Sequence, residues 1–138
     1  MPEQLSWLLP WLHLAGRVLF GLFFLIFGLI HLLDTGGAAR YLERKGIAGP
    51  KPAAVASGLM LLVGGVLVVL GWHRFIGAGL LFLVLLPGAF ALHPFWHEGD
   101  PAKRRASAAQ FLMMLGLAGA ALVIAVHGGQ SWPFSLGG

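Results

Sequence analysis

The chain of 138 residues is 58% hydrophobic and 10% charged, carries a formal net charge of +4 and contains no cysteine. Soluble domains have about 25% charged residues, and a domain of about 150 residues buries only roughly 70% of its surface. A soluble fold of this length could not bury so many apolar residues. The composition therefore indicates an integral membrane protein, and no nucleic-acid partner is expected. The lack of cysteine excludes disulfides, iron–sulfur clusters and thiolate metal sites, so any redox step requires a borrowed cofactor.

Four apolar segments of spanning length follow one another along the chain, at residues 12–33, 53–70, 75–92 and about 106–126. A helix needs about 20 such residues to cross the roughly 30 Å hydrocarbon layer, so each segment predicts a transmembrane helix. Consecutive helices joined by short connections pack as antiparallel neighbours. We therefore expect an all-α fold in which residues 1–138 form a single domain, a four-helix antiparallel bundle.

Short sequence signals predict where several elements begin and end. The first span is expected to remain in the mature protein, because no base precedes it and its apolar run exceeds the roughly 7–15 residues of a signal peptide. AARYLERKG (residues 38–46) is typical of a short interfacial helix ended by glycine. His93 precedes Pro94, which predicts the end of the third helix, and Asp100 followed by Pro101 predicts the start of the fourth.

Small and apolar residues recur at helical spacing on one face of each of the first three spans, which is typical of packing seams. The first span has Arg17, Gly21, Phe24, Gly28 and His31 on this face. The second has Ser57, Leu61, Gly64, Val68 and Gly71, and the third has Gly77, Leu81, Val84, Gly88 and Ala91. On the second span we expect Leu62 on the opposite side, facing lipid.

The basic residues predict the orientation in the membrane. Seven of the nine lysines and arginines fall in the loops 34–52 and 93–105. The positive-inside rule then places both loops in the cytoplasm and both termini outside, in a multi-pass protein of the cell (inner) membrane.

Arg17 lies about five residues inside the first span and has two alternative readings. Its long side chain could extend to the outer interface and leave the guanidinium in water. Alternatively it faces the interior of the bundle and binds an anionic or carbonyl oxygen.

Polar and aromatic residues gather where the spans meet the long loops. The candidate cofactor-binding residues are Arg17 and the loop-side group His31, Asp34, His93, Trp96, His97 and Gln110. Imidazole can donate a hydrogen bond to a carbonyl group and relay protons near neutral pH. The alternative is that histidine and tryptophan are ordinary interfacial residues. His93 and His97, with His31 and Asp34, could supply nitrogen and oxygen ligands to a metal, but Pro94 argues against one helix that presents both rings, so no metal site is expected. No haem is expected either, because its axial histidines would need opposed positions near the bundle core.

Four stretches of the chain resemble the DoxX family of small four-helix membrane proteins: AGRVLFGLFFLIFGLIHL, GLMLLVGGVLVVLG, LPGAFALHPFW and AAQFLMMLGLAGAALV. The resemblance implies a four-span bundle associated with membrane oxidoreductase systems. Some relatives are a subunit of a thiosulfate to quinone oxidoreductase, and others partner enzymes that detoxify sulfur compounds or superoxide. The positions that match are Arg17, Gly28, His31, Gly65, Gly71, His93 and Trp96.

This chain departs from the family pattern at three positions. Many relatives have a glutamate where this chain has Met60, and a Lys-Asn pair where it has Met113 and Met114. The replacements remove buried polar and charged groups suited to proton or anion chemistry.

Two functional hypotheses follow from these residues and from the resemblance. The first is a subunit of a membrane oxidoreductase system that binds quinone or associates with a redox partner. The second is a non-catalytic membrane scaffold or small-molecule transport module. Membrane lipids, a redox enzyme subunit and a second copy of the chain are the partners considered. The chain contains no complete catalytic set, so no reaction of its own is predicted.

The orientation can be tested by labelling single cysteines, because the natural chain has none. Ala48→Cys, in the first long loop, is expected to resist a membrane-impermeant thiol reagent added from outside, because the positive-inside rule places it in the cytoplasm. Ser131→Cys, after the fourth span, serves as the control and is expected to react. Labelling of position 48 from outside would overturn this topology.

Overall fold

The computed structural model describes residues 3–137, which fold into helices without a strand. In chain order the elements are η1 (Glu3–Leu5), α1 (Leu9–Leu33), α2 (Thr35–Arg44), α3 (Pro50–Leu70), α4 (Arg74–Leu92), η2 (Phe95–His97), α5 (Pro101–Val126) and η3 (His127–Gly129). Within the described residues, α1, α3, α4 and α5 are long and apolar enough to cross a membrane. The predicted all-α class with four spanning helices is therefore confirmed.

The local signals in the sequence mark the helix ends correctly. The short loop helix forms as α2, and Gly46 follows it with a φ of 76°, in the left-handed region that favours glycine. Helix α4 stops at Leu92, one residue before His93. The Asp100 side chain accepts a hydrogen bond from the Lys103 amide at 3.0 Å and caps α5, which therefore begins five residues before the predicted apolar span.

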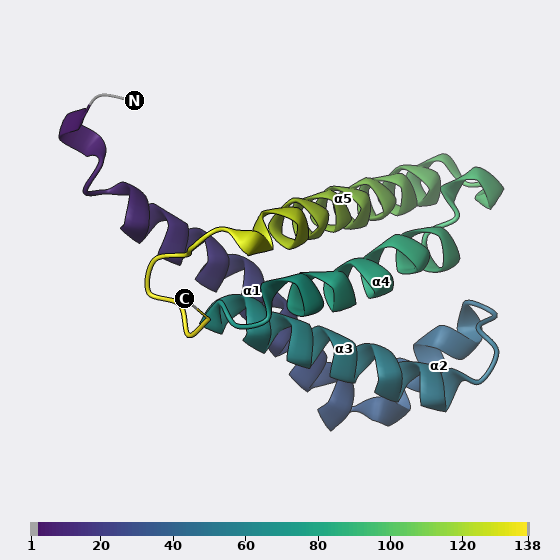
Figure 1. The fold of residues 1–138 in the computed structure, drawn as a ribbon. Coiled ribbons are helices and arrows are strands. Elements are labelled where there is room, and N and C mark those ends of the chain that lie inside the picture. The colour runs from purple at the N-terminus through teal and green to yellow at the C-terminus, as the bar shows by residue number, and fades with distance from the viewer. Residues whose placement is uncertain (1–2, 138) are drawn as a thin grey trace.

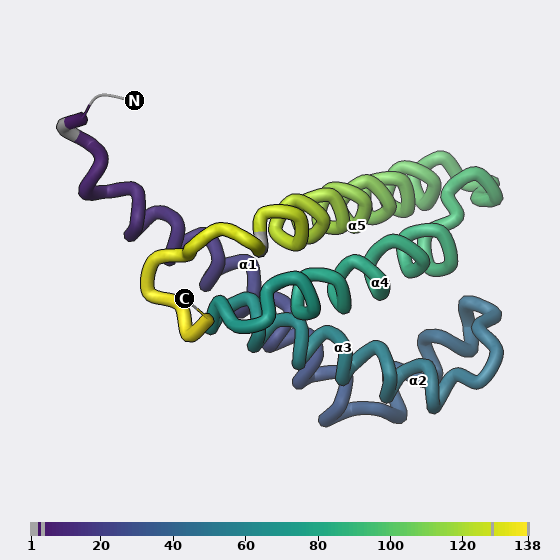
Figure 2. Tube along the Cα trace, viewed as in Figure 1, coloured from purple at the N-terminus to yellow at the C-terminus, as the bar shows by residue number. Residues whose placement is uncertain are grey.

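The spanning helices pack in chain order. Helix α1 lies along α3, α3 lies against α4, and α4 lies against α5, whereas α1 and α5 make few contacts with each other. Figure 1 shows α4 and α5 as one pair and α1 and α3 as another, with α2 beside the end of α3. The trace in Figure 2 shows the C-terminal tail running from α5 back across α1 to the turn between α3 and α4.

Glycines bring α1 and α3 together backbone to backbone. A Cβ added to Gly28 would lie 2.5 Å from the Leu62 amide nitrogen, and one added to Gly21 would lie 2.7 Å from the Gly65 carbonyl oxygen. Real side chains do not tolerate such distances, so only glycine permits this approach. The predicted packed face of α1 is confirmed, because Gly21 and Gly28 are buried against α3. Helix α3 meets this face through Gly58, Leu62 and Gly65, which lie off the seam predicted for the second span.

Helix α3 has a second packed face. A Cβ added to Gly64 would lie 2.7 Å from Leu81 Cδ2 and 2.8 Å from the Gly77 carbonyl oxygen, both on α4. Leu62 was expected to face lipid, and this expectation is wrong: its backbone lies against Gly28 of α1, and the residue is half-buried. The reason is that α3 is placed between α1 and α4 and is covered on both sides.

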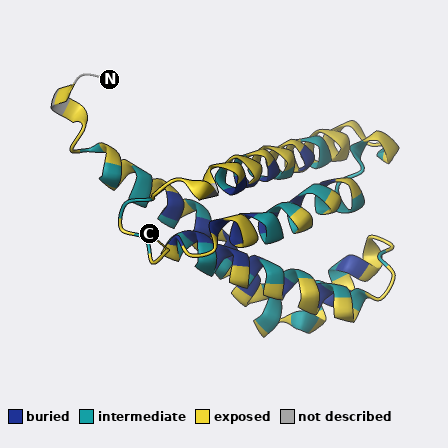
Figure 3. Cartoon of the chain, in the orientation of Figure 1, coloured by how far each residue is buried: buried dark blue, intermediate teal, exposed yellow. Residues whose placement is uncertain are grey.

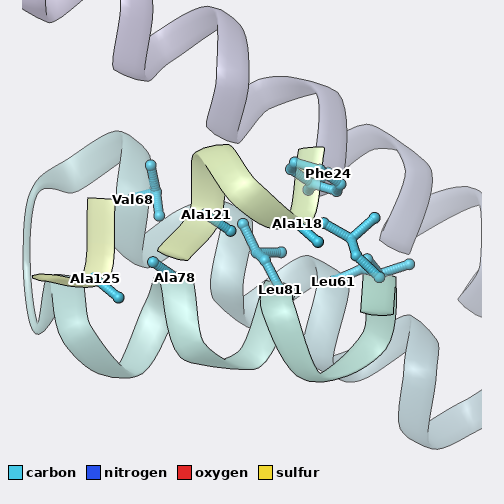
Figure 4. Packing of buried hydrophobic residues seen from close by; sticks show 9 residues of the cluster. Phe24, Leu61, Val68, Ala78, Leu81, Ala118, Ala121 and Ala125 are labelled. Atoms are coloured by element: carbon cyan, nitrogen blue, oxygen red, sulfur yellow. The ribbon is translucent and has the colours of Figure 1, made fainter. Parts of the chain in front are cut away.

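The buried core lies where all four spanning helices meet. It contains Phe24, Leu61, Val68, Ala78, Leu81, Leu85, Ala118, Ala121 and Ala125 (Figure 4). On α4 the buried face includes Ala78, Leu85 and Ala89, whereas Val84, Gly88 and Ala91 of the predicted seam are only half-buried.

Large apolar side chains cover the outside of the bundle. Leu19, Leu83 and Leu112 are 71%, 59% and 63% exposed, and exposed residues follow the outer sides of the spanning helices in Figure 3. Water would not favour such a surface, but a hydrocarbon layer does. The chain is a multi-pass membrane protein.

The tight contact at Gly64 predicts a large effect of substitution. Gly64→Leu is expected to destabilise the protein by about 2 kcal/mol or more, because the new side chain must displace Leu81 and the backbone of α4. Gly119→Leu is the matched control, because a Cβ at that exposed position meets no atom within 4 Å. Thermal unfolding of both variants in mild detergent measures the difference. Equal destabilisation would show that the α3–α4 contact is not a constraint.

Candidate functional site

A cavity of about 840 Å³ lies in the half of the bundle nearest the long loops. All four spanning helices and α2 contribute to its wall, from Phe23 to His31 on α1 and from Leu83 to Leu92 on α4. Apolar side chains form most of this wall. Phe24, Leu61 and Leu85 belong to both the wall and the buried core, so the core closes the inner end of the cavity.

Four of the seven predicted site residues line this single cavity. They are His31, Asp34, His93 and Gln110, from α1, the α1–α2 junction, the end of α4 and α5. Tyr41 of α2 and Ser57 of α3 also line it, and the sequence reasoning missed them as site residues. Both carried a signal: Ser57 lies on the predicted seam of its span, and Tyr41 lies in the predicted interfacial helix.

Local hydrogen bonds restrict what His31 and Asp34 can do. His31 Nδ1 lies 3.2 Å from the Phe27 carbonyl oxygen. A carbonyl oxygen only accepts, so Nδ1 carries the hydrogen in this bond and Nε2 is the acceptor of the neutral ring. The Asp34 carboxylate accepts a hydrogen bond from the Gly37 amide at 2.9 Å and caps α2, so one of its oxygens has a structural role.

His93 and Gln110 reach the cavity from the other pair of helices. His93 follows the last residue of α4, where its amide donates to the Ala89 carbonyl oxygen at 3.2 Å, and the residue is half-buried. Gln110 lies in the first half of α5. The cavity therefore has hydrogen-bonding side chains on opposing walls, two of them imidazoles.

Trp96 and His97 lie outside the wall of the cavity. Trp96 is 48% exposed, and its ring centroid lies 5.2 Å from that of Phe95 and 5.7 Å from that of Phe111. His97 is exposed at the end of η2. Both residues follow the end of α4 closely in the chain, but neither lines the cavity.

The three methionines that depart from the family pattern all line the cavity. Met60 comes from α3, and Met113 and Met114 come from α5. The cavity is therefore apolar at the positions where many relatives carry glutamate, lysine and asparagine. Among the described residues, no group of three or more histidine, aspartate and glutamate side chains is placed to hold a metal ion.

Arg17 lies near the opposite end of the bundle, 14 residues from His31, or about 21 Å along α1 at 1.5 Å per residue. It is only 5% exposed. Its Nη1 donates to the Pro133 carbonyl oxygen at 2.8 Å and its Nη2 to that of Phe134. Of the two readings, the interior one holds: Arg17 binds carbonyl oxygens of the chain's own C-terminal tail and does not reach the cavity.

A sequence model described as DoxX matches residues 12–94, which is more than half of the chain. The matched range contains Arg17, His31, Asp34 and His93 and ends before Trp96. No curated protein and no solved structure matches the chain.

The contacts of Arg17 predict that it anchors the C-terminal tail. Arg17→Ala is expected to destabilise the protein by about 3 kcal/mol, because a hydrogen bond to a charged group contributes about 1.5–3 kcal/mol and two are lost. The freed tail should also be cut faster by chymotrypsin after Phe134. Arg105→Ala, at an exposed position of α5, is the control and should change neither property. Unchanged cleavage in Arg17→Ala would contradict the anchoring role.

Proposed function

Because the chain belongs to the DoxX family, we propose that it is a quinone-associated subunit of a membrane oxidoreductase system, with the quinone held in the loop-side cavity. The observation that carries the proposal is one apolar cavity with His31, His93 and Gln110 in its wall. The family alone supports the membrane and redox setting, and the cavity supports the class of ligand.

The size and wall of the cavity suit a lipid-soluble ring. Ligand sites are mostly apolar hollows of about 300–1,000 Å³ with a few polar groups that fix orientation. A cavity of about 840 Å³ falls within that range. Its methionines add flexible, polarisable side chains that adapt to a planar ring or an isoprenoid chain.

The polar residues of the wall match the carbonyl groups of a quinone. The neutral imidazole of His93 has one N–H donor, and the amide of Gln110 has two, so each can donate to a carbonyl oxygen. The N–H of His31 already donates to the Phe27 carbonyl oxygen, so this ring offers an acceptor nitrogen instead. A bound quinone would supply two-electron redox chemistry. The chain itself would bind and orient it, and its imidazoles would hold or release protons.

The electrons would come from a partner protein. The chain has no cysteine, and its described residues place no metal-binding group, so its own side chains offer no electron relay. A redox enzyme subunit that docks at the loop side would lie nearest the cavity. In this proposal the chain binds the quinone, and the partner enzyme supplies the electrons.

The transport alternative has less support. A transport path needs a polar route through the bundle, whereas Phe24, Leu61 and Leu85 close the inner end of the cavity with apolar side chains. A scaffold role requires no ligand at all. The two hypotheses therefore differ in whether the purified protein contains a bound prenyl-tailed molecule.

The test combines extraction with a substitution in the cavity wall. Organic extraction of protein purified in mild detergent is expected to yield a prenylated quinone. His93→Ala is expected to weaken binding of a short-chain quinone analogue about fivefold, the equivalent of one lost hydrogen bond of roughly 1 kcal/mol. Calorimetric titration measures this change.

His127→Ala is the control for the quinone test. His127 is exposed at the far end of α5, where its Nδ1 lies 2.9 Å from the Val123 carbonyl oxygen. This variant should bind the analogue like the natural protein. An extract without quinone, together with equal binding by His93→Ala, would exclude the proposal and favour the scaffold.

A further inference from the structure

Two arginines are buried at the end of the bundle opposite the cavity. Arg17 of α1 is 5% exposed, and Arg74, the first residue of α4, is 8% exposed. The guanidinium carbon of Arg17 lies 5.9 Å from the ring centroid of Trp132, and that of Arg74 lies 4.9 Å from it. Both arginines therefore pack against one indole of the C-terminal tail. Two positive charges thus share a small, mostly dry volume.

The acidic residues of the chain lie elsewhere. There are five, and four of them belong to the loop side: Asp34, Glu43, Glu98 and Asp100. The fifth, Glu3, is exposed in η1, ahead of the first spanning helix. No carboxylate side chain among the described residues is placed to neutralise the two arginines.

Several polar atoms at this end have no hydrogen-bond partner within residues 3–137. They are Arg17 Nε, Arg74 Nη1, His13 Nδ1 and Ser135 Oγ. Burying an unpaired donor costs about 1–3 kcal/mol, and more when the group is charged. Native proteins rarely leave such groups without a partner, and of these four residues Arg74 also lines a hollow at the surface.

A hollow of about 420 Å³ lies directly beside Arg74. Its wall consists of residues 72–76, at the start of α4, together with Gly137. No side chain caps α4, so the backbone N–H groups of its first turn have no capping partner. The residues of this first turn line the hollow. The helix N-terminus adds a partial positive charge to the full charge of Arg74.

We infer that this hollow is a phosphate-binding site, in which Arg74 and the first turn of α4 hold the oxyanion. Guanidinium groups bind phosphate through paired hydrogen bonds, and helix N-termini favour anions. The inference concerns the opposite end of the bundle from the quinone cavity and does not depend on it.

The surroundings allow the phosphate to come from a lipid headgroup or from solution. Trp72 and Phe75, in the wall of the hollow, are 48% and 71% exposed, as expected for side chains at a membrane interface. The tail forms the remaining wall, since the Leu136 amide donates to the Leu70 carbonyl oxygen at 3.0 Å and Arg17 holds residues 133 and 134. A bound anion would therefore stabilise both α4 and the tail.

The first experiment uses the full chain in mild non-ionic detergent with inorganic phosphate as the probe. Phosphate is expected to raise the thermal unfolding midpoint more than sodium chloride at equal ionic strength, because it binds the folded state. Arg74→Gln should weaken this binding about tenfold or more, whereas Arg105→Gln, at the loop end, should leave it unchanged. A version with residues added after Gly138 controls for the chain's own terminal carboxylate and should bind phosphate at least as tightly.

The second experiment identifies the source of the phosphate. Native mass spectrometry compares retention of phosphatidylglycerol with retention of diacylglycerol, which has the same tails and no phosphate. Retention of phosphatidylglycerol that is lost in Arg74→Gln, without a response to inorganic phosphate, assigns the site to a lipid headgroup. A response to inorganic phosphate assigns it to the free anion.

Three results would overturn the inference. The first is that the protein prefers neither phosphate over chloride nor phosphatidylglycerol over diacylglycerol. The second is that Arg74→Gln binds the probe as tightly as the natural protein does, and the third is that the extended chain no longer binds phosphate. If Arg74→Gln fails to fold, Arg74→Lys replaces it, because lysine retains the positive charge. The inference then depends on whether the natural protein prefers phosphate over chloride or phosphatidylglycerol over diacylglycerol.

Discussion

Backbone contact between α1 and α3 is the constraint on which the rest of the structure depends. In a bilayer, apolar side chains gain little by leaving lipid, so helices associate through close packing. Gly21, Gly28 and Gly65 allow these two backbones to touch. Helix α1 is thereby held against α3 and makes few contacts with α5. The cavity lies in the loop-side half, with residues of both this pair and the α4–α5 pair in its wall.

The two ends of the bundle have different chemistry. The loop end has an apolar cavity with two imidazoles, and four of the five acidic residues lie in or beside its loops. The other end has two buried guanidinium groups, one indole and a hydrogen-bonded tail. The proposed quinone would therefore bind at the first end, and the proposed phosphate at the second. The core of Phe24, Leu61 and Leu81 separates the two sites.

The methionines determine what the cavity can bind. Met60, Met113 and Met114 stand where many DoxX relatives carry a glutamate, a lysine and an asparagine, and all three line the cavity. A charged group there would require a partner in the dry interior, whereas a thioether requires none. In this chain the three methionines leave that part of the cavity wall without a charged group.

The sequence by itself determined the membrane class, the four spans, the caps at Asp100 and Gly46, and the packed face of α1, because hydropathy, turn chemistry and helical spacing are local properties. Only the tertiary structure decided which candidates share a site. Periodicity shows which residues lie on one face of a helix, but not which neighbour covers that face. The second packed face of α3, the separation of Arg17 from His31, and the contact of Arg17 with a tail more than 100 residues away along the chain all depend on how the helices meet.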